Sequence, residues 1–320
     1  MTSNNKYKLI NNKNIISLSL MMKDITTKNN IIRLYAPDIF FALRKKWLKS
    51  RNKPYNDLNY YINNLNFDFK NSKKGDGKSE MLFIDSGPFL IKQLKENEFN
   101  YFINKLIVPY YEHMKNYKNS LLLKFYGMYE IEGMKFVVLN KVDIDCNGGS
   151  KIKYDLKGSR VNKKSKSTTK IEGDFGNSEI IFNNKKKHEK FIKQLKNDTK
   201  FLKENNLIDY SLFVVICKNS NKSKNSNNTD ISNFKAILYN NNQDTFNIQV
   251  KCSIIDFLQN YNKIKKFQST IKTAPERFTT KSFKLQKSII SAIPPENYKI
   301  RFDKYINTHF RNNYNKHPKY

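Results

Sequence analysis

The chain has 320 residues, of which 38% are hydrophobic and 13% aromatic, a composition that predicts a folded globule of one large domain or two closely packed lobes. Lys and Arg number 59 against 28 Asp and Glu, which gives a formal net charge of +31. Such a charge attracts polyanions, including nucleic acids, anionic membranes and phosphorylated substrates, without distinguishing among them.

Two further features exclude classes of protein. The cysteines Cys146, Cys217 and Cys252 are odd in number and form no CxxC pair, so we expect neither a disulfide framework nor a zinc site. No apolar run reaches the roughly 18 to 20 residues of a transmembrane helix, and residues 15–22 are too short for a signal peptide. We therefore expect a reducing, cytoplasmic setting in which any contact with membranes is peripheral.

The first 140 residues predict an antiparallel sheet with an inserted helix. A first helix is expected to start at Asp38, and a second is indicated by the helical spacing of Phe99, Phe102, Ile103 and Leu106. Strands are predicted at residues 67–69, 81–85, 88–94, 121–131 and 134–140. This order of elements resembles that of a kinase-type small lobe.

The second half of the chain is more polar. The clearest helix is predicted at residues 187–206, where Phe191, Ile192, Leu195, Thr199 and Leu202 form one apolar face. Strands are expected directly after it and near residues 248–258, separated by a low-complexity insertion at 218–233. A last helix is expected to open at Pro294 and Pro295 and to bury Tyr298, Phe302, Tyr305 and Ile306.

Two aspartates stand inside apolar runs, Asp209 in LIDYSLFVVI and Asp256 in SIIDFL. Both runs are typical of buried strands, where an unpaired carboxylate is costly, so we expect these acids to be functional. Mg²⁺ is a natural partner because hard cations bind oxygen ligands, and a kinase needs one acid near the acceptor hydroxyl and one on the metal. The alternative for Asp209 is a turn cap after the preceding helix.

Three features suit phosphate binding, and each has a plain structural alternative. Lys92 in FLIKQL either faces solvent or contacts nucleotide phosphates. The turn at Gly75 and Gly77 lets backbone N–H groups approach a phosphate, although it matches neither GxGxxG nor GxxxxGK[ST] and is otherwise a hairpin loop. Lys157 in DLKGS lies beside a glycine, in either a phosphate-binding loop or a surface turn.

Together these motifs resemble the phosphatidylinositol phosphate kinase family. The similar stretches, in the family's order, are PFLIKQL, LLLKFYGMY, KYDLKGSR, LIDYSLFVVI, SIIDFLQNYNKIKK and ENYKIRF. The resemblance runs from about Leu34 to Phe310, nearly the whole chain, and several motifs in order are more specific than any one of them.

The resemblance implies an α+β, two-lobed, kinase-like fold. Its N-terminal lobe, residues 1–140, would hold an antiparallel sheet, and a smaller mixed C-terminal lobe, residues 141–320, would follow, with a cleft between them. Together they would form one kinase domain. This domain would use ATP and Mg²⁺ to phosphorylate a phosphatidylinositol monophosphate, with the 4-phosphate as the favoured substrate and the 4,5-bisphosphate as product.

The family's site residues are carried over motif by motif. Lys92 would contact the ATP phosphates, Asp209 would orient or deprotonate the attacking hydroxyl, and Lys157 would stabilise the transferring phosphoryl group. Asp256 would bind Mg²⁺. The remaining nucleotide contacts would be the altered glycine turn and the hinge that brackets the adenine, namely Gly75, Gly77, Val138, Leu139 and Asn140.

Residues 261–290 carry eight basic residues and one acid. They resemble the family's specificity loop, in which Lys265, Lys266 and Lys272 would contact substrate and an anionic leaflet; the alternative is a solvated charge run. Each charge near such a leaflet adds up to about 1 kcal/mol of binding. Gln268 stands where the 4-phosphate branch usually has Glu and the 5-phosphate branch Ala.

Two other functions stay open. One is a soluble inositol polyphosphate kinase, whose DxKxG signature the chain misses by one residue, and the other is a non-enzymatic basic module that binds membrane or nucleic acid. No nucleic-acid-binding motif supports the latter, so nucleic acid is not expected as a partner. The expected partners are an anionic membrane surface, the phosphoinositide substrate and, because the family often dimerises through its small lobe, a second copy of the chain.

Overall fold

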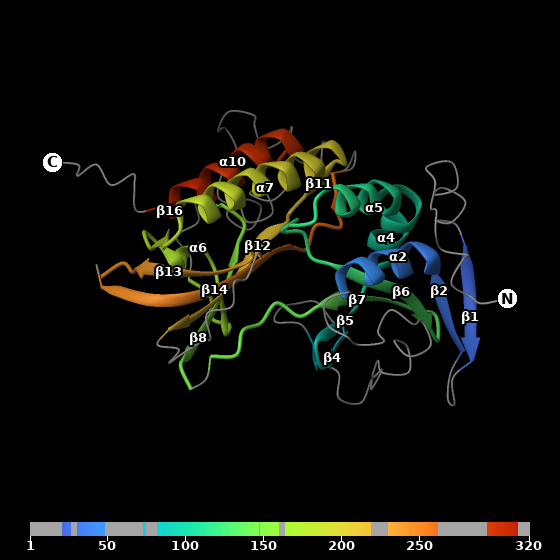
Figure 1. Ribbon diagram of the computed structural model, residues 1–320. Helices are drawn as coiled ribbons and strands as arrows, with labels where there is room; N and C mark the ends of the chain where they lie inside the picture. Colours follow the sequence, from blue (N-terminus) through green and yellow to red (C-terminus); the bar gives the residue numbers. More distant parts are fainter. Residues whose placement is uncertain are drawn as a thin grey trace, which may run out of the picture. The chain divides into compact units, whose positions relative to one another are not determined.

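The computed structural model describes residues 21–26, 31–48, 73–74, 82–146, 148–159, 164–218, 230–242, 244–261 and 293–312. The chain divides into two compact units, each built around its own sheet (Figure 1). Unit 1 comprises Met1–Lys118 and Leu123–Lys141, and unit 2 comprises Asn119–Leu122 and Val142–Tyr320. The predicted α+β class is confirmed.

Unit 1 contains an antiparallel sheet in the order β1-β2-β6-β7-β5-β4-β3. Its strands are β1 (Met22–Thr26), β2 (Ile31–Tyr35), β3 (Lys73–Lys74), β4 (Leu82–Ser86), β5 (Phe89–Gln93), β6 (Phe125–Ile131) and β7 (Met134–Asn140). The apolar residues of β2 alternate, so that Ile32 and Leu34 enter a core shared with Phe136 and Val138. The predicted strands at 81–85, 88–94, 121–131 and 134–140 are confirmed in type, whereas residues 67–69 lie outside the described residues.

The helices of unit 1 follow the predicted apolar spacing. α2 (Pro37–Leu48) contains Asp38 in its first turn, where a negative charge favours the helix dipole. α4 (Glu96–Tyr101), a π-helical segment η5 (Phe102–Leu106) and α5 (Ile107–Asn116) form one helical run. The four predicted core residues of this run, Phe99, Phe102, Ile103 and Leu106, are all buried.

Unit 2 contains a mixed sheet in the order β16-β10-β13-β14-β12-β8-β9. Its strands are β8 (Ser150–Leu156), β9 (Thr169–Lys170), β10 (Glu179–Phe182), β12 (Ser211–Lys218), β13 (Asn233–Tyr239), β14 (Thr245–Ile255) and β16 (Phe310–Asn312). The β8–β9 and β10–β16 pairs are parallel. Because each sheet has seven described strands and unit 2 spans the longer part of the chain, the prediction of a smaller C-terminal part is wrong.

Two long helices lie side by side in unit 2 (Figure 1). α7 (Lys185–Glu204) confirms the predicted helix, and Asn184 caps its N-terminus by accepting from the Lys187 N–H at 2.9 Å. α10 (Pro295–His309) starts at the predicted proline pair and buries Tyr298, Phe302 and Ile306. The short helix α6 (Glu172–Phe175) and a two-stranded sheet, β11 (Leu207–Ile208) with β15 (Gln259–Asn260), complete the unit.

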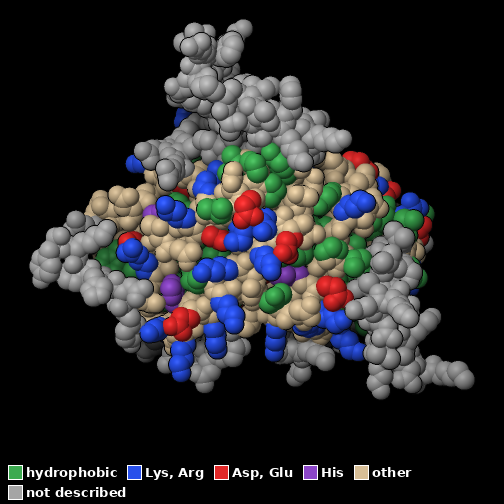
Figure 2. Space-filling view, turned by 90° about the horizontal axis from the view of Figure 1, so that it is seen from above, with side chains coloured by type: hydrophobic (Ala, Val, Ile, Leu, Met, Phe, Trp, Pro, Cys, Tyr) green, Lys and Arg blue, Asp and Glu red, His purple; other side chains and the backbone are tan. Residues whose placement is uncertain are grey.

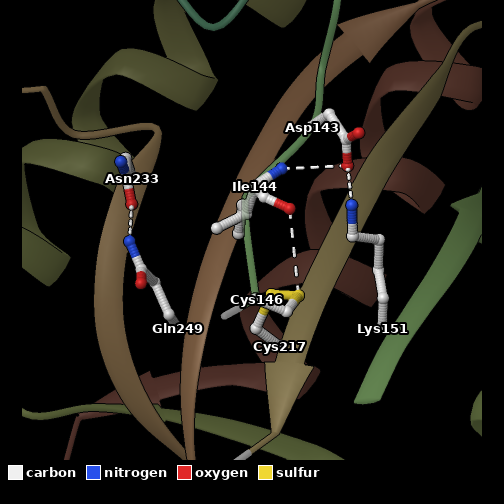
Figure 3. The surroundings of a disulfide bond; sticks show 7 residues. All are labelled: Asp143, Ile144, Cys146, Lys151, Cys217, Asn233 and Gln249. Atoms are coloured by element: carbon white, nitrogen blue, oxygen red, sulfur yellow. Dashed lines mark hydrogen bonds and ion pairs between the residues drawn. A yellow bond between two sulfur atoms is a disulfide. The ribbon is translucent and has the colours of Figure 1, made fainter. Parts of the chain in front are cut away.

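Cys146 and Cys217 form a disulfide whose Cα atoms lie 5.5 Å apart (Figure 3). The sequence predicted no disulfide, and this prediction is wrong because the partners are 71 residues apart and become neighbours only when the segment before β8 packs on β12. Ile144, Cys146, Val215 and Cys217 share one apolar cluster there. Cys252 is a free, buried cysteine, and the argument for a reducing compartment from cysteine usage no longer holds.

Candidate active site

Three strands of unit 2 end at the same edge of the sheet. β8 ends at Leu156, which pairs with Leu212, and β14 ends at Ile255, which pairs with Ser211, the first residue of β12. Lys157 follows the first strand end directly, and Asp256 follows the second. Asp209 lies two residues before β12. The register therefore brings the three predicted reacting residues of unit 2 to one place.

The small β11–β15 sheet holds the two aspartate turns together. Ile208 pairs with Gln259 on the far side of the turns, and Ser211 pairs with Ile255 on the near side. The Tyr261 N–H also donates to the Asn206 carbonyl at 2.8 Å. Each turn is thus closed at both ends by backbone hydrogen bonds, which fixes where its aspartate can lie.

The sequence predicted that Asp209 and Asp256 lie inside buried strands, and this prediction is wrong. Both occupy turns in the left-handed region, with φ of +65° and +56°, which few residues other than glycine adopt and which Asp tolerates better than most. Asp256 is exposed and Asp209 is partly exposed. Two buried apolar residues, Phe257 and Leu258, follow Asp256 and belong to the turn and not to β14. Because they continue the apolar run, the sequence carries no sign that the strand ends at Ile255.

Lys157 and Asp209 form an ion pair with Nζ and Oδ1 2.8 Å apart. Their side chains are 34% and 33% exposed, so the pair is reachable from solvent without being fully hydrated. Burial by itself would lower the pKa of Lys157, but Asp209, followed by Asp155 and Asp256, raises it above its ordinary value. Lys157 is therefore a stable cation.

Asp155 is an acid of this site that was not among the predicted site residues. Burial raises the pKa of this carboxyl, and the nearby Asp256 raises it further, whereas Ser211 and Lys157 favour its charged form. Asp155 is the last residue but one of β8 and lies within electrostatic range of Lys157, which follows the end of that strand. The period-two spacing within DLKGS was the available signal.

α10 supports the site from its N-terminal half. Tyr298 Oη donates to the carbonyl of Tyr210, the residue after Asp209, at 2.5 Å. Gly158, the residue after Lys157, has φ +70°, and a Cβ there would lie 3.1 Å from Phe302 Cα. Only glycine fits this close approach between the loop and the helix backbone.

The segment Asn119–Leu122 supports the end of β14. Asp198 of α7 is fully buried and accepts from Ser120 Oγ at 2.8 Å and from the Leu121 N–H at 2.7 Å. The Leu121 carbonyl in turn accepts from the N–H of Ile254, two residues before Asp256, at 2.7 Å. This chain of bonds fixes the strand end from which Asp256 projects.

The predicted nucleotide residues of unit 1 lie on two paired strands. Lys92 of β5 is opposite Val137 of β7, it is half-buried, and its Nζ lies 5.8 Å from the ring centroid of Phe83. Val138 and Leu139 are buried near the end of β7, and Asn140 Oδ1 accepts from the Lys124 N–H at 2.8 Å. The predicted residues Gly75, Gly77, Lys265, Lys266 and Lys272 lie outside the described residues.

The described residues contain no group of three or more His, Cys, Asp or Glu that could hold a metal ion. This donor set still fits Mg²⁺ bound together with a nucleotide, because Mg²⁺ is usually held by one or two carboxylates plus substrate phosphates. Asp256, exposed at the strand end and within electrostatic range of Asp155 and Lys157, is such a carboxylate.

Comparison with known proteins identifies the family. The family model described as phosphatidylinositol-4-phosphate 5-kinase matches residues 66–246 and 232–309, and the chain therefore belongs to this family. The resemblance noted in the sequence is confirmed.

Individual relatives agree with the family match. A phosphatidylinositol 4-phosphate 5-kinase of Plasmodium falciparum (isolate 3D7) is 27% identical over 88% of this chain and 18% of its own length. Phosphatidylinositol 4-phosphate 5-kinases 4 and 9 of Arabidopsis thaliana are 26% and 27% identical over 57% and 56% of this chain, and over 24% and 22% of their own lengths. The chain thus spans about a fifth of the length of these relatives.

Proposed function

We propose that the chain is a lipid kinase that transfers the γ-phosphate of ATP to phosphatidylinositol 4-phosphate and forms the 4,5-bisphosphate. The observation that carries this proposal is the Lys157–Asp209 ion pair beside Asp256, at the meeting point of three strand ends. Membership of the family supports the reaction class, and relatives named phosphatidylinositol 4-phosphate 5-kinase support the choice of substrate.

The roles follow from the chemistry of each group. Asp209 accepts the proton of the attacking inositol hydroxyl, and the Lys157 ammonium, 2.8 Å from its Oδ1, orients its carboxyl group. Lys157, a stable cation, balances the negative charge on the phosphoryl group while it moves. Asp256 holds Mg²⁺, which, when bound, neutralises charge on the ATP phosphates.

Unit 1 supplies the nucleotide contacts in this proposal, and the two units form the N- and C-terminal lobes of one kinase domain, with their boundary near residue 140. Lys92 binds ATP phosphates, and Gly75 and Gly77 contribute backbone N–H groups to the same phosphates. The hinge residues Val138, Leu139 and Asn140 bracket the adenine. The hydrogen bond from the Lys124 N–H to Asn140 Oδ1 supports this assignment, because it fixes the backbone at the end of β7.

The basic segment 261–290 selects the surface on which the enzyme acts. Lys265, Lys266 and Lys272 contact the anionic leaflet and the substrate headgroup, so that the protein is peripheral to the membrane. Among the described residues, no helix is long and apolar enough to cross a bilayer. The net charge of +31 supports attraction to such a leaflet.

The first prediction concerns the two aspartates. Asp209→Asn and Asp256→Asn remove a charge while keeping a residue that tolerates left-handed φ, so we expect both variants to fold. Turnover should fall by about 10² to 10⁴-fold in each, because each removes a general base or a metal ligand. The measurement is transfer of labelled γ-phosphate to vesicles that contain each of the phosphatidylinositol monophosphates, followed by headgroup analysis of the product.

The matched control is Asp244→Asn. Asp244 is exposed, lies directly before β14 and accepts from Asn240 Nδ2, whereas Asp256 lies directly after the same strand. This variant should retain wild-type turnover. Activity confined to soluble inositol phosphates would overturn the lipid substrate, and wild-type turnover in both aspartate variants would overturn the kinase assignment.

A further inference from the structure

Glu172, the first residue of α6, is an acid that the proposed reaction does not use. It is 9% exposed, and its Oε1 accepts from the backbone N–H groups of Lys157 and of Ser159, the latter at 3.2 Å. One carboxylate oxygen thus binds the residues on both sides of Gly158. Hydrogen bonds from a neutral N–H to a charged acceptor are about twice as strong as neutral ones.

The loop of residues 157–159 needs these hydrogen bonds because it lies beyond the end of β8 and is no longer part of the sheet. β8 ends at Leu156, so the N–H groups of residues 157 and 159 have no partners in a strand ladder, and Gly158 turns the chain with φ +70°. A buried N–H without an acceptor destabilises a fold, because it has lost its hydrogen bond to water and gained none in return. α10 packs against Gly158 with Phe302 and Tyr305. Both the carboxylate of α6 and the backbone of α10 therefore contact the loop. Glu172 accepts from its N–H groups, whereas Arg301 Nη2 of α10 donates to the Lys157 carbonyl at 3.5 Å.

Holding this backbone decides where the Lys157 ammonium lies. Four rotatable bonds separate the Lys157 Cα from Nζ, and Nζ is 2.8 Å from Asp209 Oδ1. A misplacement of about 1 Å at a reacting centre can lower a rate by about 10²-fold. When the backbone of residue 157 is already fixed, less conformational entropy is lost as the Lys157 side chain becomes ordered against Asp209.

We propose that Glu172 is a positioning residue that fixes the backbone of residues 157–159 and thereby sets the Lys157 ammonium for phosphoryl transfer. This inference rests on the proposed function of the site. Glu172 does not touch the reacting atoms, because its Oε1 is directed at backbone N–H groups. It acts through Lys157.

Asp174 offers a matched control on the same helix. Its Oδ2 accepts from the N–H groups of Ser165 at 2.9 Å and of Ile171 at 3.0 Å. These bonds are of the same kind as those of Glu172, but they do not involve the residues on either side of Gly158. Loss of Asp174 therefore disturbs α6 without releasing the backbone of Lys157.

The second prediction compares Glu172→Ala, Glu172→Gln and Asp174→Ala in the full chain. In the lipid assay, Glu172→Ala should lower kcat by about 10- to 100-fold and change the KM for ATP by less than about threefold, since Lys157 acts mainly on the transition state. Glu172→Gln should restore most of kcat, because its carbonyl oxygen accepts the same two bonds. Asp174→Ala should stay within about threefold of wild type.

Hydrogen–deuterium exchange of the peptide covering residues 155–159 tests the same contacts without catalysis. Exchange should be faster in Glu172→Ala than in the wild type and unchanged in Asp174→Ala. If Glu172→Ala does not fold, Glu172→Asp, which keeps the charge but withdraws the acceptor by one methylene, takes its place and should show both effects in weaker form.

The outcomes separate this inference from the proposed function. An inactive wild-type protein whose exchange nevertheless depends on Glu172 would contradict the kinase assignment and leave the loop contact supported. An active wild type with unchanged kcat in Glu172→Ala would overturn the positioning role. Equal losses in Glu172→Ala, Glu172→Gln and Asp174→Ala would also overturn it, because they would indicate a general role of α6 in stability.

Discussion

Single residues at this site are held in conformations that most side chains avoid. Asp209 and Asp256 both have positive φ, and Gly158 has φ +70° beside a helix that a Cβ would meet. For residues other than glycine, backbone conformations of this kind cost roughly 1 to 3 kcal/mol each and persist where surrounding structure enforces them, often at functional sites. Their concentration at one edge of a single sheet fits a site selected for chemistry and not for stability.

The third prediction concerns the pH dependence of the ion pair. Asp209, Asp155 and Asp256 outweigh burial and raise the pKa of Lys157 above its ordinary 10.5. A raised folded-state pKa means that the stabilisation is complete below the unfolded value and is lost as the pH rises through the folded value. We therefore expect the profile of kcat against pH to show no alkaline decline caused by Lys157 below pH 10.5.

The comparison for this profile is Lys157→Arg, which keeps a cation that does not titrate in this range. A decline in the wild type at a pH well below 10.5 that is absent from Lys157→Arg would contradict the raised pKa. Where the two proteins decline together, the titrating group is another residue.

At the scale of elements, pairing between strands creates the site. The β8, β12 and β14 register places three strand ends together, and the β11–β15 pair closes the two aspartate turns on their other side. The segment Val142–Cys146 is also held against this sheet, because its apolar residues pack on β12 next to the disulfide (Figure 3). Asp143 supports it by accepting from Lys151 Nζ at 2.7 Å.

The fourth prediction concerns the Cys146–Cys217 disulfide. It closes a loop of 71 residues, and a crosslink of this kind typically stabilises a fold by about 2 to 4 kcal/mol. We expect a reductant to lower the free energy of unfolding by that amount in chemical denaturation. The double variant Cys146→Ala/Cys217→Ala should be destabilised from the start and should not respond to the reductant.

Thiol labelling gives an independent check on the same bond. In the denatured but unreduced protein, the free Cys252 should react while Cys146 and Cys217 should not. Labelling of all three cysteines would show that the two sulfurs are not bonded in the purified protein.

At the scale of the whole molecule, the main feature is the excess of basic residues. One side of α7 carries exposed lysines, and Figure 2 shows basic side chains spread among fewer acidic ones over one face of the described surface. The exposed lysines of α7 are Lys185, Lys186, Lys190, Lys193, Lys196 and Lys200. With a net charge of +31, we expect long-range attraction to an anionic leaflet to precede the specific contact with a headgroup that is proposed above.

The fifth prediction is that membrane binding depends on salt. Raising the salt from about 0.1 M to about 0.5 M shortens the screening length to less than half, so the fraction bound to anionic vesicles should fall by at least about tenfold. Vesicle sedimentation measures this, with neutral vesicles as the control. Binding that is unchanged by salt would indicate an apolar contact in place of an electrostatic one.

Much of the fold was predictable because its signals are local. The spacing of Phe191, Leu195 and Leu202 predicted α7, and the proline pair before Tyr298 predicted the start of α10. Lys157 and Asp209 were singled out from their motifs, and the structure pairs them. Glu172 was missed, because a polar stretch around a four-residue helix gives no periodic signal.

The amino-acid sequence by itself determined the α+β class, the family and the identity of the residues proposed to react, since composition, apolar period and motif order are properties of the chain. Only the tertiary structure decided that Asp256 lies on an exposed turn, that Cys146 meets Cys217, and that Glu172 binds the backbone of Lys157. The reason is physical: strand register and loop closure join residues far apart in the chain, and such contacts leave no local pattern.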